Sequence, residues 1–230
     1  MITLGIETST MTGGAALLDG DRLVAGSTLN VNITHSERLL PGLDRMLRDS
    51  GIGTEQIDVV AVSSGPGSFT GLRVGMSMAK GLVFSSRRRL VCVPTLEAFA
   101  WRFAGSRYPV CALFDARKKE LYGALFVWND ALETFQRAVP EQALSPEGWV
   151  EQLLNYDRIM LAGEGARMHA ADFRERLGQK AVFAPPHLMS PSAEAVAFLG
   201  AKLASQGAFA DPAQASPFYL RKSEAELKKK

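Results

Sequence analysis

The sequence has little of what an enzyme working through a metal ion or a thiol would need. It contains only two cysteines, Cys92 and Cys111, and three histidines. Both cysteines fall within apolar runs, where a buried free thiol is the ordinary state of the residue. None of His35, His169 and His187 has a cysteine or a second histidine at the spacing of metal ligands. We therefore predict neither a structural zinc site nor another bound metal ion.

Long hydrophobic runs and a strong excess of charge are also lacking. No apolar run approaches the ~20 residues that cross a bilayer, and a strand pattern begins at the N-terminus. We expect a cytoplasmic protein with no membrane span and no signal peptide. The 26 lysines and arginines nearly balance the 24 acidic residues, and the formal net charge is +2. That charge is too small for a chain that binds nucleic acid alone through bulk electrostatics, so any RNA contact is expected to be shared with a partner.

What the sequence does contain is an ordered series of strand and helix patterns. In the first half, Asp19-Gly20 is a hairpin signal between two apolar segments, and Thr34 followed by Glu37 has the spacing of a helix capping box. Pro41 is expected to bend the helix that follows. The first half is predicted to form strands at 2–7, 13–18, 22–29, 58–62 and 90–93 and helices at 36–50, 72–85 and 95–103.

The second half repeats the order of the first. Its strands are predicted at 109–115, 121–128, 133–139, 158–162 and 181–184, and its helices at 146–155, 166–177 and 192–206. Two βββαβαβα units indicate a duplicated α/β fold, with a first lobe at residues 1–104 and a second, smaller lobe at 105–230. The boundary is expected in the turn-rich stretch 105–109. Ligands of such folds favour strand ends and the cleft between lobes.

A glycine-rich loop separates the strand at 58–62 from the helix that follows. Gly65, Gly67 and Gly71 permit positive φ or close backbone approach, and the free N–H groups at a helix start favour an anion. The loop lacks the lysine of a Walker A motif, because leucine and arginine follow Gly71. Thr70 stands at the third glycine position of a dinucleotide-binding motif. Anion binding and a purely structural turn are therefore equally supported.

Five segments spread along the chain resemble the TsaB (YeaZ) family. The glycine loop reads Gly-Pro-Gly-Ser-Phe-Thr-Gly-Leu-Arg-Val-Gly, which is similar to the hallmark of that family. The matching segments are residues 6–10, 35–41, 65–75, 115–122 and 217–221. The first of them differs at Glu7, where the family usually has aspartate.

This resemblance implies both a fold and a function. The fold would be the actin-like, sugar-kinase-like ATPase fold, which is RNase H-like. The chain would be a non-catalytic subunit that acts with the catalytic paralogue TsaD and the ATPase TsaE. Together they transfer threonylcarbamoyl from threonylcarbamoyl-AMP to N6 of adenosine 37 in tRNAs reading codons that begin with A. The family also implies a heterodimer with TsaD, a homodimer when TsaD is missing, and indirect contact with tRNA. It implies no cofactor of the chain's own, so ATP or ADP and magnesium would belong to the assembled complex.

The first candidate site is a partner interface on the first-lobe helices. Gly71, Gly75 and Ala79 lie four residues apart, and glycine inside a helix costs stability unless a close neighbour benefits. We expect part of this surface to be exposed, and packing on the chain's own sheet is the equally weighted alternative. The interface is expected to comprise His35, Leu39, Leu43, Met46, Leu47, Gly71, Leu72, Gly75, Met76 and Ala79.

The second candidate is a nucleotide or anion site at the ends of two strands. Its expected residues are Glu7, Thr8, Ser9, Gly65, Gly67, Ser68 and Thr70. Glu7 could hold a magnesium ion through water, but actin-like ATPases carry Asp-x-Gly there, and this chain has no glycine at that place. No catalytic residue is predicted. The TsaD family has a His-x-x-x-His metal pair on the corresponding helix, and Leu39 stands four residues after His35.

Other functions remain open at this point. The chain could be a stand-alone ATPase or metallopeptidase of the same fold, or a structural protein that associates with itself. Basic clusters at 87–89, 117–119 and 228–230 are most simply solvated surface, and the sequence does not say which of them contacts tRNA. Thr95, Asp115 and Tyr122 are equally candidates for local hydrogen bonding and for a site.

Overall fold

The computed structural model describes residues 1–31, 34–84 and 86–221. Within these residues the chain forms two five-stranded sheets and divides into two compact units. Unit 1 comprises Met1–Ala98 and Pro191–Phe218, and unit 2 comprises Phe99–Ser190 with the described residues from Tyr219 onward. The basic cluster at 228–230 lies outside the described residues.

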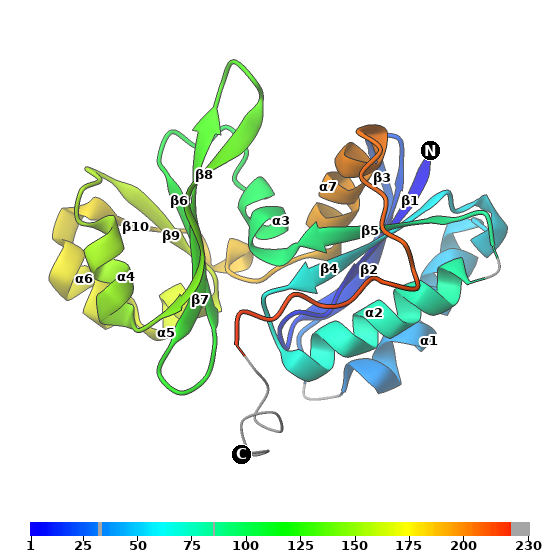
Figure 1. Ribbon diagram of the computed structural model, residues 1–230, viewed down its shortest axis with the longest axis horizontal. Coiled ribbons are helices and arrows are strands. Elements are labelled where there is room, and N and C mark those ends of the chain that lie inside the picture. The colour runs from blue at the N-terminus through cyan, green and yellow to red at the C-terminus, as the bar shows by residue number, and fades with distance from the viewer. Residues whose placement is uncertain (32–33, 85, 222–230) are drawn as a thin grey trace. The chain divides into compact units, whose positions relative to one another are not determined.

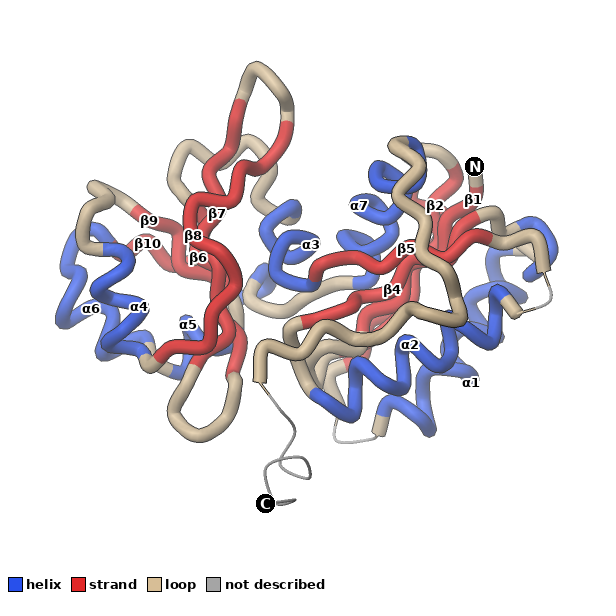
Figure 2. The backbone as a smooth tube through the Cα atoms, viewed as in Figure 1, coloured by secondary structure: helices blue, strands red, loops and turns tan. Residues whose placement is uncertain are grey.

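Unit 1 is a mixed sheet covered by helices on both faces. Its strand order is β3-β2-β1-β4-β5, in which β1, β4 and β5 run parallel and β2 is antiparallel to both of its neighbours. Figures 1 and 2 show α1 and α2 on one face of this sheet and α7 on the other. The elements of unit 1 are β1 Ile2–Glu7, β2 Gly13–Asp19, β3 Arg22–Leu29, α1 His35–Ser50, a 3-10 turn Thr54–Gln56, β4 Val59–Gly65, α2 Phe69–Val83, β5 Arg89–Pro94, the start of α3 Thr95–Trp101, and α7 Ala193–Ser205.

Alternate residues of the strand β2 pack on opposite faces of the unit 1 sheet. Ala15 and Leu17 belong to the core under α1 and α2, while Ala16 and Leu18 contact small residues of α7. Successive side chains of a strand point to opposite faces, so a strand covered on both faces is apolar throughout. The continuous apolar run at 15–18 is explained by this double coverage.

The helix α1 begins and ends where its local sequence directs. The predicted capping box is confirmed, because Glu37 accepts the backbone N–H of Thr34 at 3.1 Å. At the other end Gly51 takes the left-handed conformation, with φ 67°, and its N–H donates to the carbonyl of Arg48. Pro41 lies inside the helix, and the bend expected there stays a prediction.

Unit 2 repeats the topology of unit 1. Its strand order is β8-β7-β6-β9-β10, which is the same succession as in unit 1, so the predicted repeat of the strand order is confirmed, while duplication stays a prediction. The predicted helix at 166–177 is two shorter helices that meet at His169. The elements of unit 2 are the end of α3, β6 Val110–Asp115, β7 Leu121–Asn129, β8 Thr134–Leu144, α4 Pro146–Leu153, β9 Ile159–Ala162, α5 Glu164–Met168, α6 Ala170–Leu177, a 3-10 turn Gly178–Lys180, β10 Ala181–Phe183, and a 3-10 turn Pro186–Leu188.

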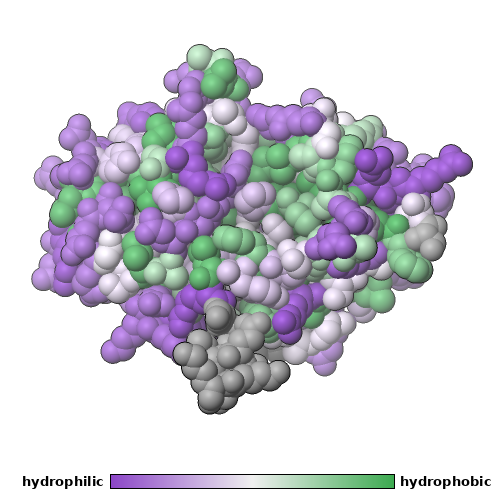
Figure 3. Space-filling model, viewed as in Figure 1, coloured by the Kyte–Doolittle hydropathy of each residue, from purple (hydrophilic) through white to green (hydrophobic). Residues whose placement is uncertain are grey.

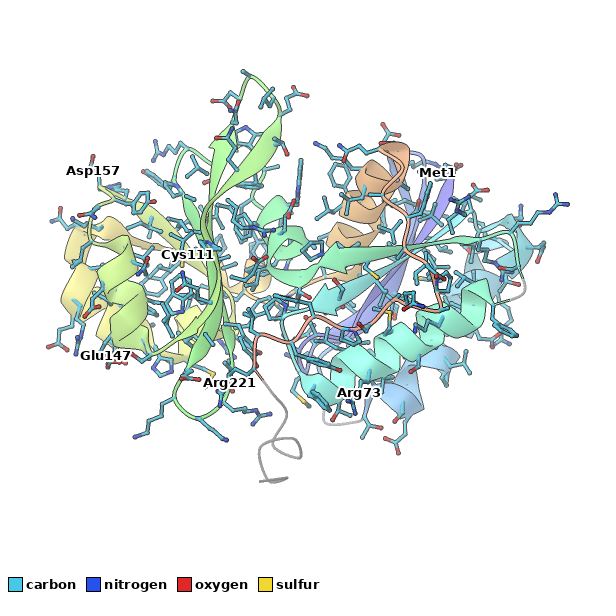
Figure 4. All side chains as sticks on the ribbon, in the orientation of Figure 1. Met1, Arg73, Cys111, Glu147, Asp157 and Arg221 are labelled. Atoms are coloured by element: carbon cyan, nitrogen blue, oxygen red, sulfur yellow. The ribbon has the colours of Figure 1, made fainter. Side chains whose placement is uncertain are left out.

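The core of unit 2 lies between its sheet and the helices α4 to α6. Trp149 is fully buried there, and its indole N–H donates to the carbonyl of Leu121 at 3.1 Å. Cys111, labelled in Figure 4, is a free thiol in the same core, and burial raises its pKa. The view in Figure 3 shows mostly hydrophilic residues over α4 and α6.

The boundary between the units differs from the expected division at 104/105. Residues 191–218 belong to unit 1, because α7 packs on β1, β2 and β4. Small residues allow this close contact: a Cβ on Gly5 would lie 2.4 Å from the carbonyl oxygen of Ala193, and one on Gly200 would lie 2.2 Å from the Cβ of Ala61. Residues 99–104 belong to unit 2, where the ring of Phe99 packs edge-on against Phe114 at 5.0 Å. Within the described residues, no helix is both long and apolar enough to cross a membrane.

Candidate functional site

The candidate anion site forms where β1 and β4 end at the same edge of the unit 1 sheet. The two strands are parallel neighbours, so the turn after β1 and the glycine loop after β4 lie against each other. The backbone N–H of Ser68 donates to the carbonyl of Ser9 at 2.6 Å, and that of Thr8 donates to the hydroxyl of Ser63 at 3.3 Å. The structure therefore brings the two predicted segments of this site together.

Glu7 is a buried carboxyl group at the end of β1. It is 1% exposed, and its Oε1 accepts the backbone N–H of Ser9 at 2.5 Å and the hydroxyl of Ser63 at 3.3 Å. Burial raises the pKa of Glu7 to about 7, and the hydrogen bonds from Ser9 and Ser63 oppose that rise. Magnesium favours ionised carboxylates that keep its bound waters accessible. The burial of Glu7 leaves little room for the waters that magnesium usually keeps.

The glycines of the loop are required by close backbone contacts. A Cβ on Gly67 would lie 2.6 Å from the carbonyl oxygen of Ser9, and one on Gly71 would lie 2.1 Å from that of Thr8. Gly65 has φ 120°, and a Cβ there would lie 2.2 Å from the carbonyl oxygen of Phe218. Other segments of the chain therefore occupy the positions that side chains would take in place of these glycines. These contacts favour the structural alternative for the loop, while anion binding stays a prediction.

Hydrogen bonds also fix both sides of the loop. The N–H of Gly65 donates to the hydroxyl of Thr95 at 2.9 Å, and the N–H of Phe218 donates to the carbonyl of Ser64 at 2.7 Å. Ser68 is the N-cap of α2, and its hydroxyl accepts the N–H of Gly71 at 3.3 Å. Thr95 thus forms a local hydrogen bond, which is one of the two roles expected for it.

The expectation that the small face of α2 is exposed is wrong. Gly71, Leu72, Gly75, Met76 and Ala79 are all buried. The narrow face packs on the chain's own first turn, because a Cβ on Gly75 would lie 2.3 Å from the hydroxyl oxygen of Thr8. The leucines and the methionine of α1 that were predicted at the interface also face the core. Leu39, Leu43 and Met46 are buried, and Leu47 is partly buried against them.

Other residues of α1 and α2 form the exposed side of these helices. We call them the outer strip, which comprises Leu40 on α1 and Arg73, Ser77, Gly81 and Phe84 along and just after α2. Leu40 is 59% and Phe84 80% exposed. The guanidinium of Arg73, labelled in Figure 4, stacks over the ring of Phe69 at 3.8 Å.

His35 and Arg38 fasten the start of α1 to the turn after β1. The Nε2 of His35 donates to the carbonyl of Thr10 at 2.7 Å, and its Nδ1 accepts an N–H of Arg38 at 3.1 Å. Arg38 also donates to the carbonyls of Met11 at 2.6 Å and Leu29 at 3.0 Å. Burial, and then the charge of Arg38, lower the pKa of His35, so the ring is neutral at neutral pH. Sequence reasoning missed Arg38, although its place three residues after His35 puts both on one helix face.

A cavity of about 280 Å³ lies beside this clamp, at the N-termini of α1 and α2. Helix N-termini carry partial positive charge, so the cavity has a positive character to which Arg38 adds. It is lined by Thr10, Met11, Thr34, His35, Ser36, Arg38, Ser68, Thr70, Gly71 and Val74.

Unit 2 has a corresponding carboxyl group, Asp115, at the end of β6. Its Oδ1 accepts the backbone N–H of Arg117 at 2.8 Å, so Asp115 is a local hydrogen-bonding residue. Three consecutive residues of this loop, Arg117, Lys118 and Lys119, have φ values of 63°, 53° and 61°. For residues other than glycine, this left-handed conformation costs roughly 1–2 kcal/mol each. At the base of the loop Arg221 pairs with Glu120 at 2.6 Å. Tyr122 has a raised pKa, chiefly through burial, and its role stays open.

The sequence of this chain matches a known protein family. A family model described as TsaD: tRNA N6-adenosine threonylcarbamoyltransferase matches residues 30–229. The tRNA threonylcarbamoyladenosine biosynthesis protein TsaB of Bacillus subtilis (strain 168) is 31% identical, over 99% of this chain and 97% of that protein. The chain belongs to the TsaB family.

Solved structures extend the likeness to the fold. YeaZ from Pseudomonas aeruginosa superimposes with a TM-score of 0.79 at 27% identity, over 95% of this chain and 99% of that chain. Component A of (R)-2-hydroxyglutaryl-CoA dehydratase from Acidaminococcus fermentans reaches 0.54 at 11% identity, over 89% of this chain and 99% of that chain, and shows the fold alone. The expected actin-like, sugar-kinase-like ATPase fold is confirmed for this TsaB-family chain. Within its described residues, no group of three or more His, Cys, Asp and Glu side chains could hold a metal ion.

Proposed function

We propose that this chain is a non-catalytic subunit of the machinery that makes threonylcarbamoyladenosine in tRNA. It acts with TsaD and TsaE in the transfer of threonylcarbamoyl from threonylcarbamoyl-AMP to N6 of adenosine 37, in tRNAs reading codons that begin with A. TsaD carries out the transfer, and this chain supports it as a bound partner. The name of the Bacillus relative and the TsaD family model support the pathway.

One observation carries the non-catalytic role. The turn after β1 and the glycine loop fill each other's space, since Ser68 bonds to Ser9 and the glycines contact the carbonyls of Thr8 and Ser9. In an ATPase of this fold, such loops leave their N–H groups free for phosphate. Here they brace α2 against the sheet, and Glu7 is buried beneath them with a raised pKa. ATP or ADP and magnesium act in the assembled complex through the other subunits.

The partner surface is the outer strip of α1 and α2. It presents two exposed apolar side chains, Leu40 on α1 and Phe84 just after α2, together with the exposed small residues Ser77 and Gly81. Exposed apolar residues beside small ones suit the close approach of another helix. TsaD binds this strip, and a second copy of the chain covers it when TsaD is missing.

Reconstitution with each component omitted in turn tests this proposal. Transfer to a tRNA transcript is expected only when this chain, TsaD and TsaE are all present. The chain alone is expected to show neither transfer nor ATP hydrolysis. ATP- or metal-dependent turnover by the chain alone that survives purification, and is lost in Glu7→Ala, would favour the stand-alone ATPase or metallopeptidase alternative. Gel filtration with and without TsaD distinguishes a subunit of this complex from a protein that only associates with itself.

A further inference from the structure

The loop between β6 and β7 places three adjacent cationic residues in a conformation that their side chains disfavour. Arg117, Lys118 and Lys119 are all left-handed and exposed, and the side chain of Arg117 is 84% exposed. Glycine or asparagine would adopt this backbone with less strain. Strained backbone that persists in a folded protein is concentrated at functional sites. The folded structure therefore does not explain why an arginine and two lysines occupy these positions.

Other groups hold the loop in shape. The N–H of Ala116 donates to the carbonyl of Glu120 at 2.9 Å, and the N–H of Glu120 donates to the carbonyl of Arg117 at 3.1 Å. Asp115 accepts the N–H of Arg117, and Arg221, labelled in Figure 4, bonds to the carboxylate of Glu120 at the base of the loop. Of the three cationic residues only Arg117 takes part in these bonds, through its backbone N–H and carbonyl, so another residue that tolerates the left-handed region would preserve them.

We propose that this loop is a phosphate-binding element that contacts the sugar–phosphate backbone of the tRNA. The inference rests on the proposed function, which brings a tRNA to the complex. Three cations on consecutive exposed residues can meet neighbouring phosphates. Contacts of this kind are dominated by charge and position the RNA without reading its bases.

The surroundings of the loop favour a polyanion over an acidic protein. Protein interfaces contain an apolar centre within a polar rim. No apolar residue between 113 and 122 is exposed, and this end of unit 2 is hydrophilic in Figure 3. Asp115 accepts the backbone N–H of Arg117 and pairs with its guanidinium at 3.8 Å, and Glu120 pairs with Arg221. A charged surface without an apolar centre matches an RNA backbone.

The test is tRNA binding by the complex of this chain with TsaD, measured by fluorescence anisotropy over a series of salt concentrations. The probe is an unmodified transcript of a tRNA that reads codons beginning with A. The double variant Lys118→Asn/Lys119→Asn keeps residues that tolerate the left-handed region and removes two charges. It is expected to reduce the slope of log K against log salt by roughly 2 and to weaken binding roughly 10- to 100-fold at ~0.1 M salt. Its melting temperature is expected to rise by roughly 2–4 °C.

Two control variants separate a local contact from general charge. Lys118→Arg/Lys119→Arg keeps the cations and is expected to retain the affinity and the salt slope. Arg22→Asn/Arg176→Asn removes the same charge from exposed positions elsewhere and is expected to leave tRNA binding nearly unchanged. An equal loss of affinity in this second control would overturn the proposal, because bulk charge would then explain the effect.

Two further outcomes would also overturn it. One is an unchanged salt slope in Lys118→Asn/Lys119→Asn, with a wild-type complex that binds and modifies tRNA. That result would leave the proposed function standing and remove only this site. The other is normal tRNA binding with weaker assembly with TsaD or TsaE, which would assign the loop to an acidic protein surface. A wild-type chain that is dispensable for transfer would instead count against the proposed function.

Discussion

The backbone N–H of Ser9 donates to Oε1 of Glu7, two residues earlier, across 2.5 Å. The bond closes the turn after β1 upon a carboxyl group that is almost fully buried. In a catalytic lobe of this fold the same position would need an ionised carboxylate open to a hydrated metal ion. Here the carboxyl serves the turn itself, and its titration is therefore coupled to folding.

The raised pKa of Glu7 predicts a stability that depends on pH. The folded state favours the neutral form of Glu7. The stability that this preference contributes is fully present below the unfolded pKa of 4.5 and is lost as the pH rises through about 7. At about 1.4 kcal/mol per pKa unit, the difference is worth about 3 kcal/mol. Glu7→Gln is expected to remove the decline in unfolding free energy between pH 5 and pH 8, as measured by urea titration. The exposed Glu175→Gln is the control, and equal declines in all three proteins would contradict the assignment.

The same substitution at two glycines of α2 is expected to have opposite effects. A Cβ on Gly71 would lie 2.1 Å from the backbone oxygen of Thr8, so Gly71→Ala should destabilise the protein by about 1–3 kcal/mol. Gly81 has nothing within 4 Å of such an atom, so Gly81→Ala should stabilise by about 0.8–1 kcal/mol through helix propensity. Unfolding in urea measures both changes. A stable Gly71→Ala variant would show that the turn after β1 yields readily.

The outer strip can be tested without damaging the core. Ser77→Arg places a charge on the exposed side of α2, where the folded monomer tolerates it. Burying that unpaired charge at an interface costs roughly 3–5 kcal/mol, so TsaD binding and self-association should both fall by at least about 100-fold. Gel filtration and titration calorimetry measure the loss, and circular dichroism checks the fold. Gln152→Arg on α4 is the control. Unchanged association in Ser77→Arg would remove this strip from the interface.

Removal of the Arg38 clamp should loosen the turn after β1. Arg38→Gln loses the hydrogen bonds to Met11 and Leu29 and leaves their carbonyls to water, at an expected cost of about 1–3 kcal/mol. Amide exchange in residues 8–12 should become faster than in β6, which serves as an internal reference. Arg45→Gln, an exposed residue on the same helix, is the matched variant. If both variants exchange alike, the clamp contributes nothing to the turn.

Local patterns were sufficient to predict most elements and their order. Thr34 with Glu37 gave the start of α1, and the alternation around Asp19-Gly20 gave a hairpin, because these signals are complete within a few residues. The position of α7 could not be predicted in this way. The apolar face of α7 would suit any sheet. The residue that Ala193 contacts, Gly5 on β1, lies almost 190 residues earlier in the sequence.

The candidate site was predicted in part for the same reason. The pairing of residues 7–9 with the glycine loop follows from two parallel strands that end together, and it was anticipated. The direction of the small face of α2 was not, since Gly71 and Gly75 suit a partner's helix as well as the hydroxyl of Thr8. The left-handed conformation of Arg117 could not be predicted from the sequence, because arginine does not favour that conformation.

The return of α7 to the first sheet also affects the order in which the protein can fold during synthesis. One face of that sheet is without its helix until Ser205 has left the ribosome, more than 100 residues after β5 is complete. At about 5–20 residues per second, this delay is roughly 5–20 s. During this delay, the apolar residues of β1, β2 and β4 that α7 later covers are exposed to solvent. A nascent chain stalled within unit 2 is therefore expected to engage chaperones, and the released full chain is expected to escape them.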